Sequence, residues 1–186
     1  MSENSFRKKQ AKILRFVRKV HRFMGASLFV IFLFVSITGL LLGWKKNSNG
    51  FLLPNTQKGI SKQATDWLPL ADLQEKAVFV LDSLHPELDK QLDRMDVRPG
   101  KGVVKITFEE HYHEIQLDLT SGQLLSHGKR HSDLLEQIHD GSWVDRQADI
   151  GFFKLLYTSV SGLALLLFTV TGFWLWYGPK RMRQGR

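Results

Sequence analysis

The residues of this chain that are best suited to chemistry are its seven histidines, two of which stand beside long apolar segments. His21 lies where an apolar run begins that continues to Trp44, and His139 precedes a second run that begins at Gly151. A neutral imidazole offers a nitrogen lone pair to iron, and b-type haem needs axial ligands and apolar walls but no covalent cysteine. Gly25, one helical turn after His21, would leave room for a flat macrocycle. His21 and His139 are therefore candidate axial ligands of a b-type haem.

Each histidine also has an ordinary structural explanation. His21 could be an interfacial side chain within a basic cluster. His139 could be a residue at a helix C-terminus, where the helix dipole favours a positive charge. About 24 residues of helix separate His21 from Trp44, which at roughly 1.5 Å per residue spans ~35 Å. One iron could then not be shared within a chain unless the helix over 132–140 dips deeply into the membrane. Two chains, in contrast, could pair His21 with His21 and His139 with His139 around two haems.

The remaining histidines give weaker signals. Two pairs have a spacing that could hold a metal loosely, although solvated histidines are more common. Asp140 and Asp145 lie near His139 and could orient its ring. The sequence has no recognisable nucleophile–base pair, phosphate loop or HExxH zinc helix. The two pairs are His111 with His113, and His127 with His131.

Two transmembrane helices are expected to position His21 and His139. Between Val20 and Trp44 the only charged residue is Arg22, and between Gly151 and Tyr177 it is Lys154. Both runs exceed the ~20 apolar residues that cross a bilayer core. The first is too long for a signal-peptide core and lacks a small-residue cleavage site after it.

The net charge of +8 is distributed by region. Residues 1–22 hold eight Lys and Arg, and residues 178–186 hold four, whereas residues 45–150 hold 13 against 17 Asp and Glu. The positive-inside rule places both termini in the cytoplasm and residues 45–150 outside an inner, cytoplasmic membrane. No motif for reading nucleic acid is present, so membrane and not nucleic acid is the expected partner. The absence of cysteine excludes disulfides, iron–sulfur clusters and thiolate zinc sites within the chain.

The segment between the spans predicts a small α+β domain, with one helix on an antiparallel sheet. Apolar residues recur with helical spacing over 70–84, and Pro86 ends this helix. Strands are expected at 92–97, 103–108, 115–119 and 123–126, and a further helix begins near Ser132 and stops at Gly141. The predicted organisation is 1–19 basic lead-in, 20–44 first span, 45–69 linker, 70–131 extracytoplasmic domain, 132–150 amphipathic helix and linker, 151–177 second span and 178–186 basic tail.

The two spans resemble each other. Thr38-Gly39 near the end of the first and Thr171-Gly172 near the end of the second occupy comparable places. Small residues lie in a stripe on each span, which most often means close helix packing.

Four stretches resemble the family of PepSY-associated transmembrane-helix proteins from about residue 18 to residue 181. The turn at Asp118–Gly122 departs slightly from the family's usual sequence, because Ser121 stands where the family usually has threonine. The stretches are RKVHRFMG…SITGLLLGW, DLQEKAVFVLDSLHP, GVVKITFEEHYHEIQLDLTSGQLL and IHDGSW…VSGLALLLFTVTGFWLWYGPKR.

The resemblance implies a PepSY-like outer domain. Larger, four-span relatives reduce ferric siderophores, so the resemblance also implies b-type haem bound to transmembrane histidines. His21 and His139 match the positions that such relatives use. We therefore expect a homodimeric electron-transfer protein, a ferric reductase or its subunit, acting toward ferric iron, a ferric chelate or a redox partner. Two alternatives remain: a haem-free PepSY anchor that binds an extracytoplasmic protease, and an accessory subunit of an iron-uptake system.

Overall fold

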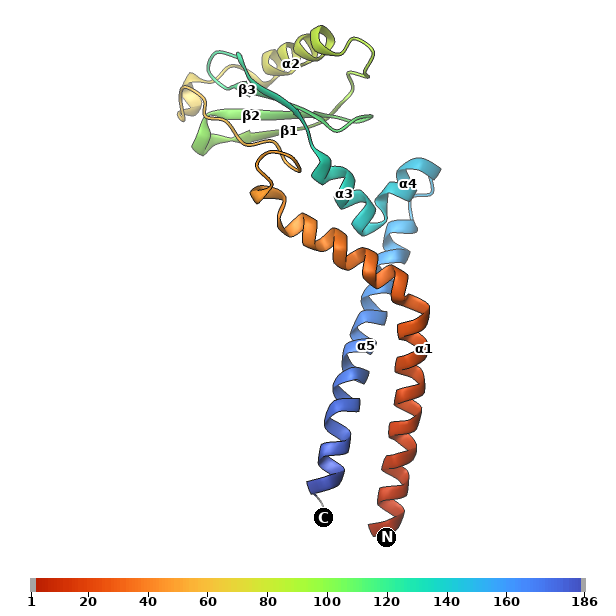
Figure 1. The fold of residues 1–186 in the computed structure, drawn as a ribbon. Coiled ribbons are helices and arrows are strands. Elements are labelled where there is room, and N and C mark those ends of the chain that lie inside the picture. The colour runs from red at the N-terminus through yellow and green to blue at the C-terminus, as the bar shows by residue number, and fades with distance from the viewer. Residues whose placement is uncertain (1–2, 185–186) are drawn as a thin grey trace. The chain divides into compact units, whose positions relative to one another are not determined.

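The computed structural model describes residues 3–184 and divides into two compact units. The helix unit comprises Met1–Gly39 and Gln137–Arg186, and the sheet unit comprises Leu40–Glu136. The two long helices and the small sheet with its covering helix are drawn in Figure 1. The fold class is thus α+β, as predicted, with a long apolar helix at each end of the chain.

The helix unit is built on α1 (Glu3–Gly43) and α5 (Phe153–Gln184), which run antiparallel beside each other (Figure 1). Leu14 packs on Gly178 near one end of the pair, and Phe32 contacts the Phe168 ring edge-on farther along. Both helices extend beyond the predicted spans, α1 into the basic lead-in. Lys, Arg and Gln are good helix formers, so the apolar helix continues through them.

Both long helices are apolar enough to cross a membrane, over Lys8–Gly43 and Phe153–Met182. Their apolar side chains are largely exposed: Phe23 keeps 72% of its surface accessible and Leu155 keeps 71%. An apolar helix in the core of a soluble protein would be buried instead. The exposure therefore agrees with helices whose outer faces are covered by lipid.

Two short helices precede α5. The first, α3 (His131–Asp140), ends just before Gly141, whose φ of +80° lies in the left-handed region that favours glycine. The second, α4 (Ser142–Ala148), was not expected in what looked like a polar connection. Asp145 then accepts hydrogen bonds from the first amides of α5, at Phe153 (2.7 Å) and Lys154 (2.8 Å). Its carboxylate thereby satisfies donors that the helix itself leaves unpaired.

The sheet unit is a four-stranded antiparallel sheet of order β1-β2-β3-β4, with α2 (Leu70–Leu84) across one face (Figure 1). The helix predicted over residues 70–84 is confirmed at both bounds as α2. Four strands form where four were expected. Short 3-10 helices occur at Lys45–Asn47, Ala64–Asp66 and Pro99–Lys101. The strands are β1 (Leu92–Arg98), β2 (Val103–Phe108), β3 (His113–Asp118) and β4 (Leu124–Lys129).

The apolar core of the sheet unit lies between α2 and one face of the sheet. Leu73, Ala77 and Leu81 recur every four residues along α2, so they form one buried stripe. They pack on alternate residues of the central strands, such as Ile106 and Leu117, which period-two geometry directs to the same face.

The opposite face of the sheet is polar but equally buried. Glu114 is completely buried and pairs with Lys105 (3.1 Å) and with Arg130. Gln116 accepts a hydrogen bond from the Gln57 amide and donates one to the Asn55 carbonyl. The segment predicted as a linker, residues 45–69, belongs to this compact unit: Asn55 and Gln57 pack on the polar face, whereas Trp67 and Leu68 pack on the apolar core.

Candidate functional site

His21 is held by the end of α5 that carries a Thr-Gly pair. Its Nδ1 lies 2.9 Å from the hydroxyl of Thr171. A β-carbon at Gly172 would come within 3.3 Å of the ring atom Cε1, so the glycine lets the imidazole approach the helix backbone. One face of the ring stacks on Phe168, with ring centres 4.0 Å apart.

His139 is held in the same way by α1. Its Nδ1 lies 2.8 Å from the hydroxyl of Thr38, which is almost fully buried. A β-carbon at Gly39 would lie 3.3 Å from Cε1 of His139. The two Thr-Gly pairs that look alike in the sequence thus perform the same task, each for a histidine on another helix.

The hydrogen bonds of the two threonines favour one assignment of the proton on each imidazole ring. Thr38 donates its only hydroxyl hydrogen to the Phe34 carbonyl (2.8 Å), and Thr171 donates to the Leu167 carbonyl (2.7 Å). With that hydrogen on the carbonyl, each hydroxyl oxygen accepts from the imidazole. On this assignment His21 and His139 are Nδ1–H tautomers with the lone pair on Nε2, the arrangement in which a metal-ligating histidine is held by a second hydrogen bond.

The two histidines occupy opposite ends of the helix pair. His21 and Thr38, which contacts His139, are 17 residues apart on α1, roughly 26 Å at the rise of an α-helix. The axial nitrogens of one haem iron lie on opposite sides of a single atom. His21 and His139 of one chain therefore cannot hold the same iron, in agreement with the prediction from helix length.

The other predicted neighbours of these histidines have different contacts. The space beside Gly25 is taken by Phe168, since a β-carbon at Gly25 would lie 3.1 Å from its ring. Asp140 accepts from Lys154 (2.6 Å) and Ser142 (2.6 Å) instead of orienting His139, and Asp145 caps α5. Burial raises the pKa of Asp140, but the hydrogen bonds from Lys154 and Ser142 outweigh it, so this pKa lies below its ordinary value.

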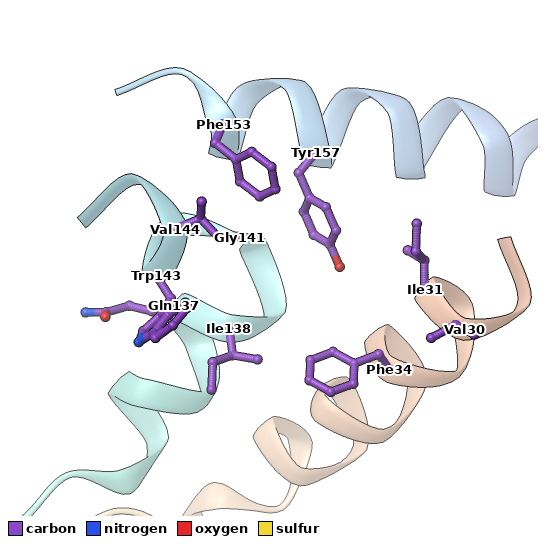
Figure 2. A pocket seen from close by; sticks show the side chains of 10 residues that line it. All are labelled: Val30, Ile31, Phe34, Gln137, Ile138, Gly141, Trp143, Val144, Phe153 and Tyr157. Carbon is purple, nitrogen blue, oxygen red and sulfur yellow. The ribbon is translucent and has the colours of Figure 1, made fainter. Parts of the chain in front are cut away.

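An apolar pocket of about 450 Å³ opens between α1, the α3–α4 turn and α5. Figure 2 shows the Tyr157 hydroxyl pointing into the space framed by Phe34 and Ile138. The pocket lies one helical turn from Thr38 along α1, while His139 itself points to Thr38. Its mostly apolar lining suits a flat or aliphatic group better than an ionic one.

The sheet unit holds a second group of chemically capable residues, and it differs from the predicted pairs. His85, His113 and His127 bring one nitrogen each within 4.8 Å of one another. His111 has both nitrogens engaged, with Asp89 and His113, and His131 stacks on Phe51 at 5.4 Å. Sequence spacing alone missed His85, which follows α2 and is 28 residues from His113.

Burial and, after it, the neighbouring histidines His111, His85 and His127 together lower the pKa of His113 to about 4, because each of them disfavours a positive charge on its ring. Burial also lowers the pKa of His127, followed by the proximity of His85. His113 is therefore neutral at physiological pH.

Comparison with known proteins and families identifies the family of the chain. No curated protein and no solved structure matches it. The family model described as the PepSY-associated TM region matches residues 18–186, which covers both histidine–threonine pairs and the whole sheet unit. The chain belongs to the PepSY-associated TM family.

Proposed function

We propose that this membrane protein transfers electrons and that His21 and His139 are axial ligands of b-type haem. The observation that carries the proposal is the repeated histidine–threonine–glycine geometry at the two ends of one helix pair. At both ends the threonine hydroxyl would accept a hydrogen bond from Nδ1–H and leave the Nε2 lone pair available for iron. Bound haem would supply a reversible one-electron Fe³⁺/Fe²⁺ couple.

A homodimer completes this proposal. One chain offers a single histidine at each end, whereas bis-histidine ligation needs two at the same level. Both imidazoles are only half-buried, and the outer faces of α1 and α5 are apolar and exposed, so a second chain can reach them. Two chains would pair His21 with His21 and His139 with His139, at levels roughly 26 Å apart along α1.

The direction of electron transfer depends on how the protein is oriented in the membrane, and the charge distribution indicates this orientation. Basic segments flank both spans at the chain termini, which favours cytoplasmic termini and an extracytoplasmic sheet unit in an inner membrane. Electrons would then pass outward, toward ferric iron or a ferric chelate. The sheet unit would guide the acceptor or a protein partner.

The first test is a reduced-minus-oxidised visible spectrum of the detergent-purified protein, produced with ample haem. We expect a bis-histidine b-type spectrum and one haem per chain. His21→Ala and His139→Ala should each retain about half of the haem, and the double variant none. His131→Ala, whose ring stacks on Phe51 in the sheet unit, is the matched control and should retain all of it.

Two results would overturn the proposal. A haem-free wild-type protein would make His21 an interfacial residue and would move the function to the sheet unit as a binding module. Full haem content in the double variant would place the ligands elsewhere. Electron transfer is tested separately by mixing dithionite-reduced protein with excess ferric citrate: the reduced spectrum should decay, and its persistence would exclude this acceptor class.

A further inference from the structure

We infer that the sheet unit binds a divalent transition-metal ion, of the Zn²⁺ or Cu²⁺ class, through His85, His113 and His127. The site is distinct from the proposed haem ligands because all three residues belong to the sheet unit. It does not depend on haem binding, so each proposal can fail without the other.

The fold brings these three histidines together from separate elements. Ile115 of β3 pairs with His127 of β4, so their side chains lie on the same face of the sheet. His113, two residues before Ile115, lies on that face as well. This is the face covered by α2, and His85 directly follows the last residue of that helix.

The spacing of the nitrogens is close to that of a metal site. Nδ1 of His113 and Nε2 of His127 are 3.0 Å apart, and all three candidate nitrogens fall within 4.8 Å of one another. Tetrahedral zinc with Zn–N bonds of about 2.0–2.1 Å requires nitrogens ~3.4 Å apart. Small side-chain rotations would therefore bring the third nitrogen to bonding distance, without movement of the sheet.

The surroundings hold two of these rings as a metal site would require. His85 Nδ1 lies 3.4 Å from the Glu87 carboxylate, which leaves Nε2 of His85 as the ligand atom. His111 packs edge-on against His113 with ring centres 5.2 Å apart. His111 itself accepts from the His113 amide and donates to the Asp89 carbonyl, so it supports His113 without being a ligand.

Partial exposure gives the site an entrance and an open coordination position. All three histidines are half-buried, so an ion can enter from solvent and a water can complete a tetrahedral shell. Three neutral imidazoles without thiolates select borderline ions such as Zn²⁺ and Cu²⁺ over Mg²⁺ or Ca²⁺, which prefer oxygen ligands.

Zinc titration by calorimetry tests the site on the full chain in detergent, stripped with a chelator and carrying an affinity tag without histidine. We expect one Zn²⁺ per chain. Binding should weaken at least tenfold in His85→Ala, His113→Ala and His127→Ala, but not in His131→Ala. Absence of micromolar binding in the wild-type protein, or equal affinity in all four variants, would overturn the inference.

A second measurement needs no variant and so does not depend on how substitutions fold. Diethyl pyrocarbonate modifies accessible imidazoles, and mass spectrometry assigns each modified histidine. Adding Zn²⁺ should slow the modification of the three ligands severalfold and leave His131 unchanged. Unchanged rates at the three histidines in the presence of saturating Zn²⁺ would contradict the site.

Discussion

His139 and Thr38 are 101 residues apart in the sequence, yet the imidazole Nδ1 lies 2.8 Å from the threonine hydroxyl. The same relationship joins His21 to Thr171 at 2.9 Å, 150 residues apart. Two histidines on different helices thus use the same kind of acceptor, next to the same kind of glycine. This repetition agrees with the proposal that the two histidines perform the same task.

Replacing the threonines tests their role as positioning residues. Thr38→Val and Thr171→Val remove the acceptor of the Nδ1 proton while nearly preserving side-chain volume. Lost second-sphere hydrogen bonds commonly reduce metal affinity about 10–100-fold, so we expect weaker haem retention and a shifted midpoint potential. Thr38→Ser and Thr171→Ser keep the hydroxyl and should restore both properties. Unchanged retention and potential in the valine variants would show that the hydrogen bonds only support packing.

The glycines beside the histidines should be intolerant of a methyl group. Gly39→Ala and Gly172→Ala would each bring a β-carbon to 3.3 Å from the imidazole Cε1, so the ring must move. We expect each variant to lose about half of the haem. Gly162→Ala is the matched control, because among the described residues nothing outside the local backbone of its own helix lies within 4 Å of its β-carbon position. It should leave haem content intact, since alanine is the better helix former by about 1 kcal/mol.

Local sequence patterns were sufficient to predict much of the fold. The stripe of Leu73, Ala77 and Leu81 determines α2, and period-two alternation determines β2, because both elements bury one face on the same core. The helix α4 escaped prediction because Ser142–Ala148 has no apolar stripe, and the left-handed turn at Gly141 sets where it begins.

The candidate sites were predictable only in part. His21 and His139 stand out by their position beside apolar helices, and the similarity of the two Thr-Gly pairs is visible in the sequence. Their pairing with the histidines depends on how α1 and α5 pack, and no local pattern encodes that register. The metal site depends on the pairing of Ile115 with His127, because only this register places His113 and His127 on one face together with His85.

Asp118 gives the sheet unit a pH-dependent contribution to its stability. Burial raises the pKa of its carboxyl, but hydrogen bonds from Ser121, Ile60 and Thr120 outweigh burial, so the pKa lies below its ordinary value. The folded state therefore binds this proton less readily than the unfolded chain. Its stabilisation is complete above about pH 4–5 and decreases as pH falls through the folded-state pKa.

Asp118→Asn tests this contribution. The amide would replace the oxygen that accepts from the Ile60 amide at 2.6 Å and would leave two donors facing each other. We expect a loss of about 2 kcal/mol near pH 7, since hydrogen bonds to charged groups are worth about 1.5–3 kcal/mol. This loss of stability is measured from the hydrogen exchange of the β2 and β3 amides, which mass spectrometry monitors. The difference from wild type should shrink below about pH 4; a difference that stays constant there would assign the effect to packing.

The proposed orientation in the membrane is tested with single cysteines, for which the cysteine-free chain is a natural background. Gly100 lies in an exposed turn with open space at its β-carbon position, and Lys9 is exposed near the start of α1. If the basic segments are cytoplasmic, an impermeant maleimide should label Gly100→Cys in cells whose outer membrane has been permeabilised. Lys9→Cys should react only after the inner membrane is disrupted. The reverse pattern would place the sheet unit in the cytoplasm, so that electrons passing from His21 to His139 would move inward and an external ferric acceptor would be excluded.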